Sequence, residues 1–286
     1  MYKDEKHIIV CDLDGTLLTS EKLISGRTRD YLIQLQKQGH ILVIASGRFY
    51  HEIITYATQL QLMDYGGYVI CGNGLEIYHK YQCVHEFSKL SQSEVKSVLQ
   101  EARKAHVCVH LHMNSQYYAT CGKLLNGIGA MAVAISHCFP TSKNFYLQSL
   151  RQFHFLTSMD AYIKEPVAKL CFFSTPRRIR KFVNYLHIAY PHSFQTYHLH
   201  HHAIELVKKD VGKDIAVQWV CDDSHYHMNQ VIAFGDSGND EALLATAGIG
   251  VTMKNGYRPV VKKARLLSHK TNNEDGVMHM LQSLLR

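Results

Sequence analysis

The chain has 286 residues, of which 46% are hydrophobic and 19% are charged, and it carries a formal net charge of +7. This composition is that of a globular protein and excludes wholesale disorder and fibrous repeats, and the length leaves room for about two domains of roughly 150 residues. The longest apolar stretches fall far short of the roughly 20 residues that a membrane span needs, so we expect no membrane partner.

The beginning of the chain alternates short apolar runs with amphipathic segments of about ten residues. This pattern is typical of βαβ units, in which helices cover both faces of a parallel sheet. In chain order, the predicted elements are a strand at Ile8–Cys11, a helix at Arg27–Gln38, a strand at Ile41–Ala45, a helix at Glu52–Met63 and a strand at Tyr68–Cys71. Gly39 is expected to end the first helix, because glycine favours the position that follows a helix.

The middle of the chain, residues 85–208, differs in composition and is richer in Tyr, His and Phe. It predicts helices at Gln92–Lys104 and Pro176–Ala189, and strands at Val107–His112, Lys169–Phe173 and Ala203–Val207. The βαβ alternation then returns, with helices at Lys213–Cys221, Asp240–Thr246 and Gly276–Leu285 and strands at Val231–Phe234 and Gly248–Met253. We therefore expect an α/β core with a doubly wound parallel sheet, formed by residues 1–84 and 209–286, and an inserted α+β domain at 85–208.

The cysteines and the basic clusters bear on the compartment and the partners. The eight cysteines include no C-x-x-C spacing, and several lie in apolar runs, which favours reduced thiols that act as small hydrophobes. The first residues leave no room for the apolar part of a signal peptide, so we expect a cytoplasmic protein. The dense basic clusters Arg177–Lys181 and Lys262–Arg265 are typical of the solvated face of a helix, so we expect no nucleic acid partner.

The strongest motif is Asp12-Leu13-Asp14-Gly15-Thr16, directly after the first predicted strand. In an open parallel sheet, ligands bind beyond the carboxyl ends of the strands, which is where these residues lie. Two carboxylates in such a turn can divide two roles, because one can attack an electrophile while the other holds or delivers a proton. The alternative is a strand-to-helix turn in which aspartate only caps the helix.

Three further groups follow at the ends of other elements. Ser46-Gly47-Arg48 comes after the second strand, where a hydroxyl and free N–H groups could bind an anion, although an ordinary serine N-cap is the alternative. Asp236, Asn239 and Asp240 follow the strand at Val231–Phe234 and offer oxygen ligands that suit Mg²⁺, against the alternative of a Gly-rich helix entry. Lys213 opens a predicted helix. The function that these motifs favour is phosphoryl transfer, because they bring acids, a hydroxyl, a cation and a metal to one edge of a sheet.

Taken together, these motifs resemble those of the haloacid dehalogenase-like superfamily, in particular the Cof-type phosphatases with a large α/β cap (subclass IIB). The resemblance spans the whole chain and implies a Rossmann-like core. The matching motifs, in chain order, are Asp12-x-Asp14-Gly-Thr, Ser46-Gly-Arg48, Asn73-Gly74, Lys213 and Gly235-Asp236-x-x-Asn239-Asp240.

The resemblance also implies a role for each matching residue. Asp12 would be the nucleophile that forms an aspartyl-phosphate, and Asp14 the acid that protonates the leaving alcohol and then the base that activates water. Mg²⁺ would be held by Asp12, Asp236 and the backbone carbonyl of Asp14. The phosphate would be bound by Ser46, Gly47, Lys213 and Asn239, and the supporting residues would be Gly15, Thr16, Arg48, Asn73, Gly74 and Asp240.

The sequence therefore predicts a Mg²⁺-dependent phosphatase of small phosphorylated metabolites, such as sugar phosphates, with the inserted domain selecting the substrate. A phosphosugar mutase on the same scaffold and a non-catalytic regulatory protein that binds a phosphometabolite remain the alternatives. We expect a monomer or a weak homodimer. The run His198–His202 raises the separate alternative of a transition-metal site, but we interpret it as an exposed polar segment that leads into the next strand.

Overall fold

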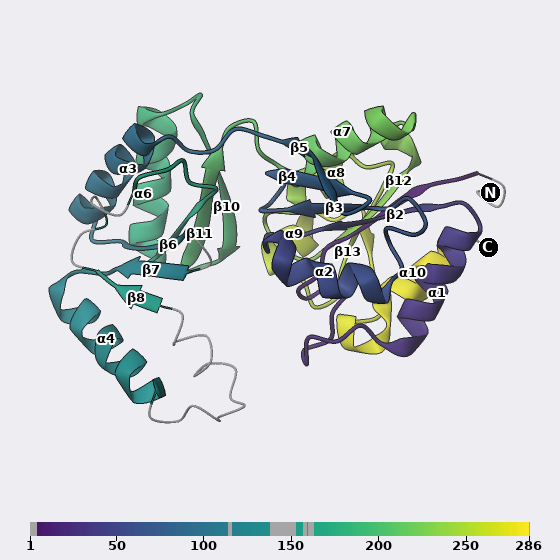
Figure 1. The fold of residues 1–286 in the computed structure, drawn as a ribbon, viewed down its shortest axis with the longest axis horizontal. Coiled ribbons are helices and arrows are strands. Elements are labelled where there is room, and N and C mark those ends of the chain that lie inside the picture. The colour runs from purple at the N-terminus through teal and green to yellow at the C-terminus, as the bar shows by residue number, and fades with distance from the viewer. Residues whose placement is uncertain (1–4, 114–115, 138–152, 157–158, 160–162, 286) are drawn as a thin grey trace. The chain divides into compact units, whose positions relative to one another are not determined.

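The computed structural model describes residues 5–113, 116–137, 153–156, 159 and 163–285 (Figure 1). The chain divides into two compact units. The core unit comprises Met1–Ser88 and Asp210–Arg286, and the inserted unit is the continuous segment Lys89–Lys209.

The core unit is built on an eight-stranded sheet in the order β14-β13-β12-β1-β2-β3-β4-β5. Its strands are β1 (Ile8–Cys11), β2 (Ile41–Ala45), β3 (Tyr68–Cys71), β4 (Glu76–His79), β5 (Gln82–Glu86), β12 (Val231–Gly235), β13 (Ile249–Thr252) and β14 (Leu266–Leu267). The strands from β14 to β3 are parallel, and β4 and β5 add an antiparallel hairpin. The chain continues from β1 to β2 and β3 on one side of β1, and later adds β12 and β13 on the other side of β1. The sheet is therefore doubly wound, which confirms the predicted fold class.

The inner strands of this sheet, such as β1, β3 and β12, are buried on both faces, and their successive side chains point to opposite sides. Ile8 and Val10 pack into one hydrophobic cluster, and Ile9 and Cys11 pack into another. The second cluster lies against α1 (Gly26–Lys37), α2 (Tyr50–Gln59) and α10 (Gly276–Leu284). The first lies against α7 (Lys213–Ser224), α8 (Glu241–Thr246) and α9 (Arg258–Lys263), so the two helical layers enclose the sheet (Figure 1).

The core unit differs from the expectation in one helix end, in one hairpin and in β14, which has no counterpart among the predicted strands. The helix predicted at Glu52–Met63 ends at Gln59, and Gln61 adopts a φ of 53°, which is incompatible with a continuing right-handed helix. The hairpin of β4 and β5 was not predicted, and its two-residue turn at Lys80 and Tyr81 has φ values of 47° and 67°. Two short 3-10 helices, η1 (Met228–Gln230) and η2 (Asn272–Glu274), complete this unit.

The inserted unit is an α+β domain on a six-stranded sheet in the order β10-β11-β9-β6-β7-β8. Its strands are β6 (Cys108–Met113), β7 (Gln116–Thr120), β8 (Phe153–Phe155), β9 (Leu170–Phe173), β10 (Phe194–His200) and β11 (Ala203–Lys208), and its helices are α3 (Gln92–Lys104), α4 (Lys123–His137) and α6 (Pro176–Ala189). The ladder is antiparallel except between β7 and β8. Side chains of α3 and α6, such as Val98 and Phe182, share one hydrophobic core with Phe172 of β9.

Candidate active site

The residues singled out in the sequence gather at the carboxyl end of the core sheet, where the strand order reverses. Asp12 directly follows β1, and its N–H donates to the carbonyl of Phe234 in β12, at 3.0 Å. Ser46 follows β2, and Asp236 follows β12. The open space at such a reversal is where doubly wound proteins bind their ligands.

Lys213, the first residue of α7, lies at the centre of this group with a fully buried side chain. Its Nζ donates to Oδ1 of Asp12 at 2.7 Å and to Oδ1 of Asp240 at 2.6 Å. Burial disfavours the charged form, but the two carboxylates outweigh it, so the pKa of Lys213 is raised above its usual value. The ammonium is therefore a permanent positive charge that fixes the Asp12 side chain.

Asp240 is a structural anchor, because both of its carboxylate oxygens are engaged. Oδ1 accepts from Lys213, and Oδ2 accepts from the N–H groups of Asp236 and Ser237 at 3.0 and 3.1 Å. Gly235 makes this approach possible, since a Cβ at that position would lie 2.5 Å from the Cβ of Asp240. The loop after β12 thus holds Asp236 in one orientation.

Asp12, Asp236 and Asp240 form an acidic cluster in which one oxygen from each lies within 4.8 Å of the others. Within the part of the chain that the structure describes, this is the only group of at least three His, Cys, Asp or Glu side chains with such spacing. Burial is the main cause that raises the pKa of Asp12 to about 7, with Lys213 opposing it and Asp240 adding to it. Burial, Asp12 and Asp240 together raise the pKa of Asp236 to about 8.

The charges of this cluster fit a divalent cation. Three carboxylates face a single ammonium, and oxygen ligands are those that hard cations such as Mg²⁺ and Ca²⁺ prefer. Because the oxygens of Asp240 are engaged, Asp12 and Asp236 are the side chains that could hold such an ion. Gly15, with a φ of 79°, leaves the space open, since a Cβ there would lie 2.5 Å from Oδ2 of Asp236. Thr16 donates to the other oxygen of Asp236 at 3.3 Å.

Asp14 is held by two cations of its own. Arg48 donates from Nε to Oδ2 and from Nη2 to Oδ1, both at 2.7 Å, and Lys22 donates to Oδ1 at 2.6 Å. Burial raises the pKa of Asp14, but the hydrogen bonds and charges of Arg48 and Lys22 outweigh it and hold that pKa below its usual value. The sequence predicted Asp14 and Arg48 in this region but gave no signal for Lys22, which lies in the loop between Asp14 and α1.

Hydrogen bonds link the predicted residues Ser46, Asn73 and Asn239. The carbonyl of Ser46 accepts from the N–H of Asn73 at 3.0 Å, and Oδ1 of Asn73 accepts from Nδ2 of Asn239 at 2.8 Å. Gly47 is required beside them, since a Cβ there would lie 2.8 Å from Oδ1 of Asn73.

Gly74 positions the loop that carries Lys213. It has a φ of 103°, and a Cβ on it would lie 2.2 Å from the carbonyl oxygen of Gly212, the residue before Lys213. The loop after β3 and the start of α7 therefore meet backbone to backbone. The predicted residues thus lie on the loops that follow β1, β2, β3 and β12 and at the start of α7.

The histidine-rich segment lies elsewhere, in the inserted unit. β10 ends at His200, so the strand does not extend through the whole run His198–His202. His201 and His202 form the turn to β11, and Nδ1 of His202 lies 3.3 Å from the carbonyl of Ser174.

Comparison with known families agrees with this geometry. A family model described as haloacid dehalogenase-like hydrolase matches residues 9–281. The chain belongs to this family. It is a hydrolase of the phosphatase type, and the acidic cluster of this haloacid dehalogenase-like hydrolase is compatible with the divalent metal that the family uses.

Relatives of this hydrolase match it along nearly the whole chain. The 5-amino-6-(5-phospho-D-ribitylamino)uracil phosphatase YitU of Bacillus subtilis is 27% identical, over 96% of each chain. The HMP-PP phosphatase of Yersinia enterocolitica is 25% identical, over 96% of this chain and 93% of that one. A solved haloacid dehalogenase-like hydrolase from Bacteroides thetaiotaomicron is 27% identical with a TM-score of 0.72, over 98% of this chain and 100% of that one. Among the helices described for this hydrolase, none is long and apolar enough to cross a membrane.

Proposed function

We propose that this chain is a Mg²⁺-dependent phosphatase that hydrolyses small phosphorylated metabolites, such as sugar phosphates, through an aspartyl-phosphate at Asp12. The observation that carries the proposal is the pairing of Asp12 with the fully buried Lys213, next to a second, half-buried acid, Asp236. This arrangement places a carboxylate that can attack phosphorus beside a fixed positive charge, at the open end of the sheet.

Asp12 and Asp236 would hold the metal, together with the backbone carbonyl of Asp14. Bound there, Mg²⁺ would neutralise part of the negative charge on the phosphoryl oxygens and on the two acids. Lys213 would bind another phosphoryl oxygen, because its ammonium already lies 2.7 Å from Oδ1 of Asp12. Ser46 and Asn239 would also bind the group, with Asn73 fixing Asn239 in place.

The reaction would proceed in two displacements on phosphorus. In the first, a carboxylate oxygen of Asp12 forms a bond to phosphorus while the bond to the leaving alcohol oxygen breaks. In the second, water attacks the phosphorus of the aspartyl-phosphate, which releases phosphate and restores the Asp12 carboxylate.

Asp14 would transfer the protons in both steps, first to the leaving oxygen and then from the attacking water. Proton donation requires the neutral acid, whereas Arg48 and Lys22 keep Asp14 ionised in the arrangement described here. The proposed role therefore includes separation of Asp14 from at least one of these cations when substrate binds.

The proposed substrate class rests on the relatives, and the inserted unit is proposed to select among such substrates. Both relatives named above act, by name, on small phosphorylated compounds. We assign the inserted unit, Lys89–Lys209, to the recognition of the leaving group, since the core residues described above serve the phosphoryl group, which all such substrates share.

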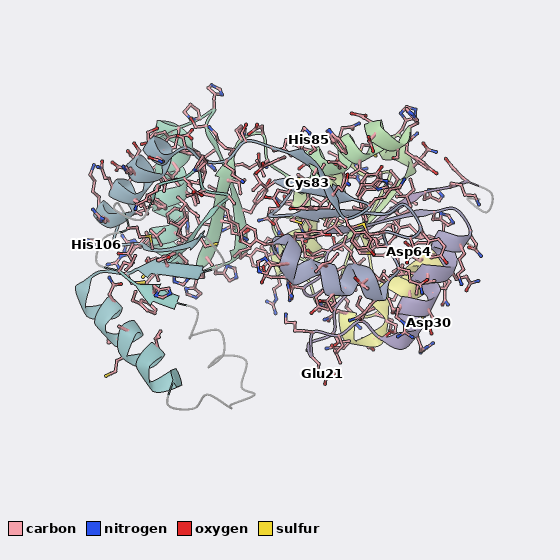
Figure 2. The ribbon with its side chains drawn as sticks, in the orientation of Figure 1. Glu21, Asp30, Asp64, Cys83, His85 and His106 are labelled. Carbon is pink, nitrogen blue, oxygen red and sulfur yellow. The ribbon has the colours of Figure 1, made fainter. Side chains whose placement is uncertain are left out.

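The test is phosphate release from an aryl phosphate, with and without Mg²⁺ and with a chelator. Asp12→Asn removes the nucleophile and is expected to abolish release while the fold is retained. Asp64→Asn is the matched control, because Asp64 is an exposed aspartate outside the site (Figure 2) and its amide should leave activity unchanged. Activity that survives in Asp12→Asn would exclude the covalent mechanism.

The same assay separates the alternatives. A panel of phosphorylated metabolites, including sugar phosphates, gives the substrate class by the ratio of kcat/KM values. Transfer of phosphate to a second sugar hydroxyl, in place of release, would indicate a mutase. Binding of these compounds without turnover would indicate a regulatory protein.

A further inference from the structure

Two cysteines of the inserted unit lie at the end of the ladder between β6 and β7, one as the first residue of β6 and the other just beyond the end of β7. In the ladder between β6 and β7, Val109 pairs with Thr120, so Cys108 and Cys121 occupy the next opposed position. Side chains directly opposite in an antiparallel pair have Cβ atoms about 4.5–5.5 Å apart, and a disulfide needs about 3.5–4.5 Å. Only a small local adjustment therefore separates these two thiols from disulfide geometry.

Both cysteines are held in place by the surrounding strands. Cys108 also pairs with Phe173 of β9, so it has a partner strand on each side. The N–H of Cys121 donates to Oδ1 of Asn126 in α4 at 2.7 Å, which fixes the backbone just beyond the end of β7.

This pair differs in its environment from the buried cysteines of the core unit. Cys11, Cys71 and Cys221 are buried, which agrees with the predicted role as small hydrophobes, and burial raises their pKa values. Cys108 and Cys121 are partly exposed. The hydrogen bond from Cys121 is the main cause that lowers the pKa of Cys108, with burial opposing it. A lower pKa favours the thiolate, which is the reactive form.

The thiols line a cavity of about 590 Å³ that opens to solvent. Arg103, His106 and Arg178 also line it, and Figure 2 shows His106 just beyond the C-terminal end of α3. A small molecule can therefore reach the sulfur atoms, and the guanidinium groups of Arg103 and Arg178 around the cavity favour both a thiolate and an anionic reactant.

We propose that Cys108 and Cys121 are a thiol modification site. A small anionic disulfide, such as glutathione disulfide, oxidises the two thiols to a reversible disulfide between Cys108 and Cys121. The thiolate of Cys108 attacks one sulfur of glutathione disulfide, forming a mixed disulfide and releasing one glutathione thiolate. The sulfur of Cys121 then attacks the sulfur of Cys108, releasing the second glutathione and the proton of Cys121. The two cysteines lose two electrons in total, and these reduce glutathione disulfide to two glutathione molecules.

The test uses the full chain in buffers with graded ratios of glutathione disulfide to glutathione, followed by alkylation, digestion with trypsin and mass spectrometry. Cleavage after Lys104 and Lys123 yields the peptide 105–123, which contains Cys108 and Cys121 and no other cysteine. We expect this peptide to lose both alkyl groups as the ratio rises, and to regain them after dithiothreitol. The predicted intermediate is a mixed disulfide on Cys108 that accumulates in Cys121→Ser.

Controls assign the order of attack. Cys108→Ser should slow glutathionylation of the remaining thiol several-fold relative to Cys121→Ser, because the attacking thiolate is gone. Cys83→Ser, which removes an exposed cysteine of β5 in the core unit (Figure 2), should leave the disulfide unchanged. The proposal is overturned if the wild-type peptide keeps two alkyl groups at every ratio. It is equally overturned if the cross-link joins two chains, which appears as a covalent dimer on a non-reducing gel.

Discussion

Replacing Lys213 with methionine is expected to cost far more stability than the loss of an ordinary ion pair. The side chains of Lys213 and Asp240 are fully buried, and that of Asp12 is 8% exposed. Removal of one partner from a buried pair leaves uncompensated charge and costs about 3–5 kcal/mol. At about 2–4 °C per kcal/mol for a domain of this size, Tm should fall by roughly 6–20 °C.

Tryptophan fluorescence is the appropriate assay, because the sequence contains a single tryptophan. Trp219 lies in α7, the helix that Lys213 begins, and its ring stacks on His85 of β5 at 5.1 Å between centroids. Its emission therefore reports unfolding of the core unit alone. The matched control is Lys263→Met, since Lys263 and Glu241 form a pair with side chains 66% and 42% exposed. Exposed pairs contribute about 0–1 kcal/mol.

A second variant and a change of pH sharpen the result. Lys213→Met combined with Asp240→Asn removes one of the stranded carboxylates, so the double variant should lose less stability than the sum of the two single variants. The cost of Lys213→Met should be larger near pH 8 than near pH 5, because Asp12 and Asp236, whose pKa values are raised to about 7 and about 8, are protonated at the lower pH. If Lys213→Met unfolds within about 1 kcal/mol of the wild type near pH 8, the reasoning from buried charge is wrong.

Three further predictions concern the same site. Once a chelator has removed divalent metal ions, Asp236 has a pKa of about 8 in the folded state. In the unfolded chain its pKa is about 4, so between these two pH values only the folded state keeps the proton. Stability measured in urea should therefore fall from about pH 4 to 8, and Asp236→Asn should reduce that fall. Gly74→Ala would place a Cβ 2.2 Å from a backbone oxygen and should lower both Tm and kcat, whereas Gly26→Ala, with open space around it, should not. The lysine of Arg48→Lys cannot donate two parallel hydrogen bonds to Asp14, so this variant should raise the pKa of Asp14 and move the corresponding limb of the pH–rate profile to higher pH. An unchanged profile would contradict the role given to these two hydrogen bonds.

Sequence patterns predicted the core sheet well, because its inner strands are short apolar runs buried on both faces. β1, β2 and β3 have the predicted limits, and the polar motifs follow directly where the apolar runs stop. The position of a residue at the carboxyl end of a parallel strand then determines which edge of the sheet it shares with others. This is why residues such as Asp12 and Asp236 could be placed together although they lie far apart in the sequence.

The hairpin of β4 and β5 could not be predicted in the same way. Its turn residues, Lys80 and Tyr81, both adopt positive φ, which usually requires Asn or Gly and is costly for other side chains. The strand pairing on either side fixes this conformation, with Tyr78 opposite Cys83 and His79 opposite Gln82. A turn that is imposed by its strands carries no local signal in the sequence.

The orientation of Asp14 was equally beyond the sequence. The motif places Asp14 beside Asp12, but the cations that bind it come from two other segments, Arg48 after β2 and Lys22 in the loop before α1. The position of Lys22 depends on the path of that loop, in which Lys22 itself adopts a φ of 62°. A motif therefore identifies which acidic and basic side chains are present. The protonation of these side chains depends on neighbouring residues that the motif does not contain.

The position of the insertion has a consequence for folding during synthesis. β1 forms its ladder with β12, and the inserted unit separates the two strands in the chain. A ribosome therefore exports the whole of the inserted unit before β12 is available, and until then β1 can pair only with β2. The edge of β1 that later carries β12 stays uncovered for that interval, which is the period when a nascent chain of this topology is most exposed to aggregation.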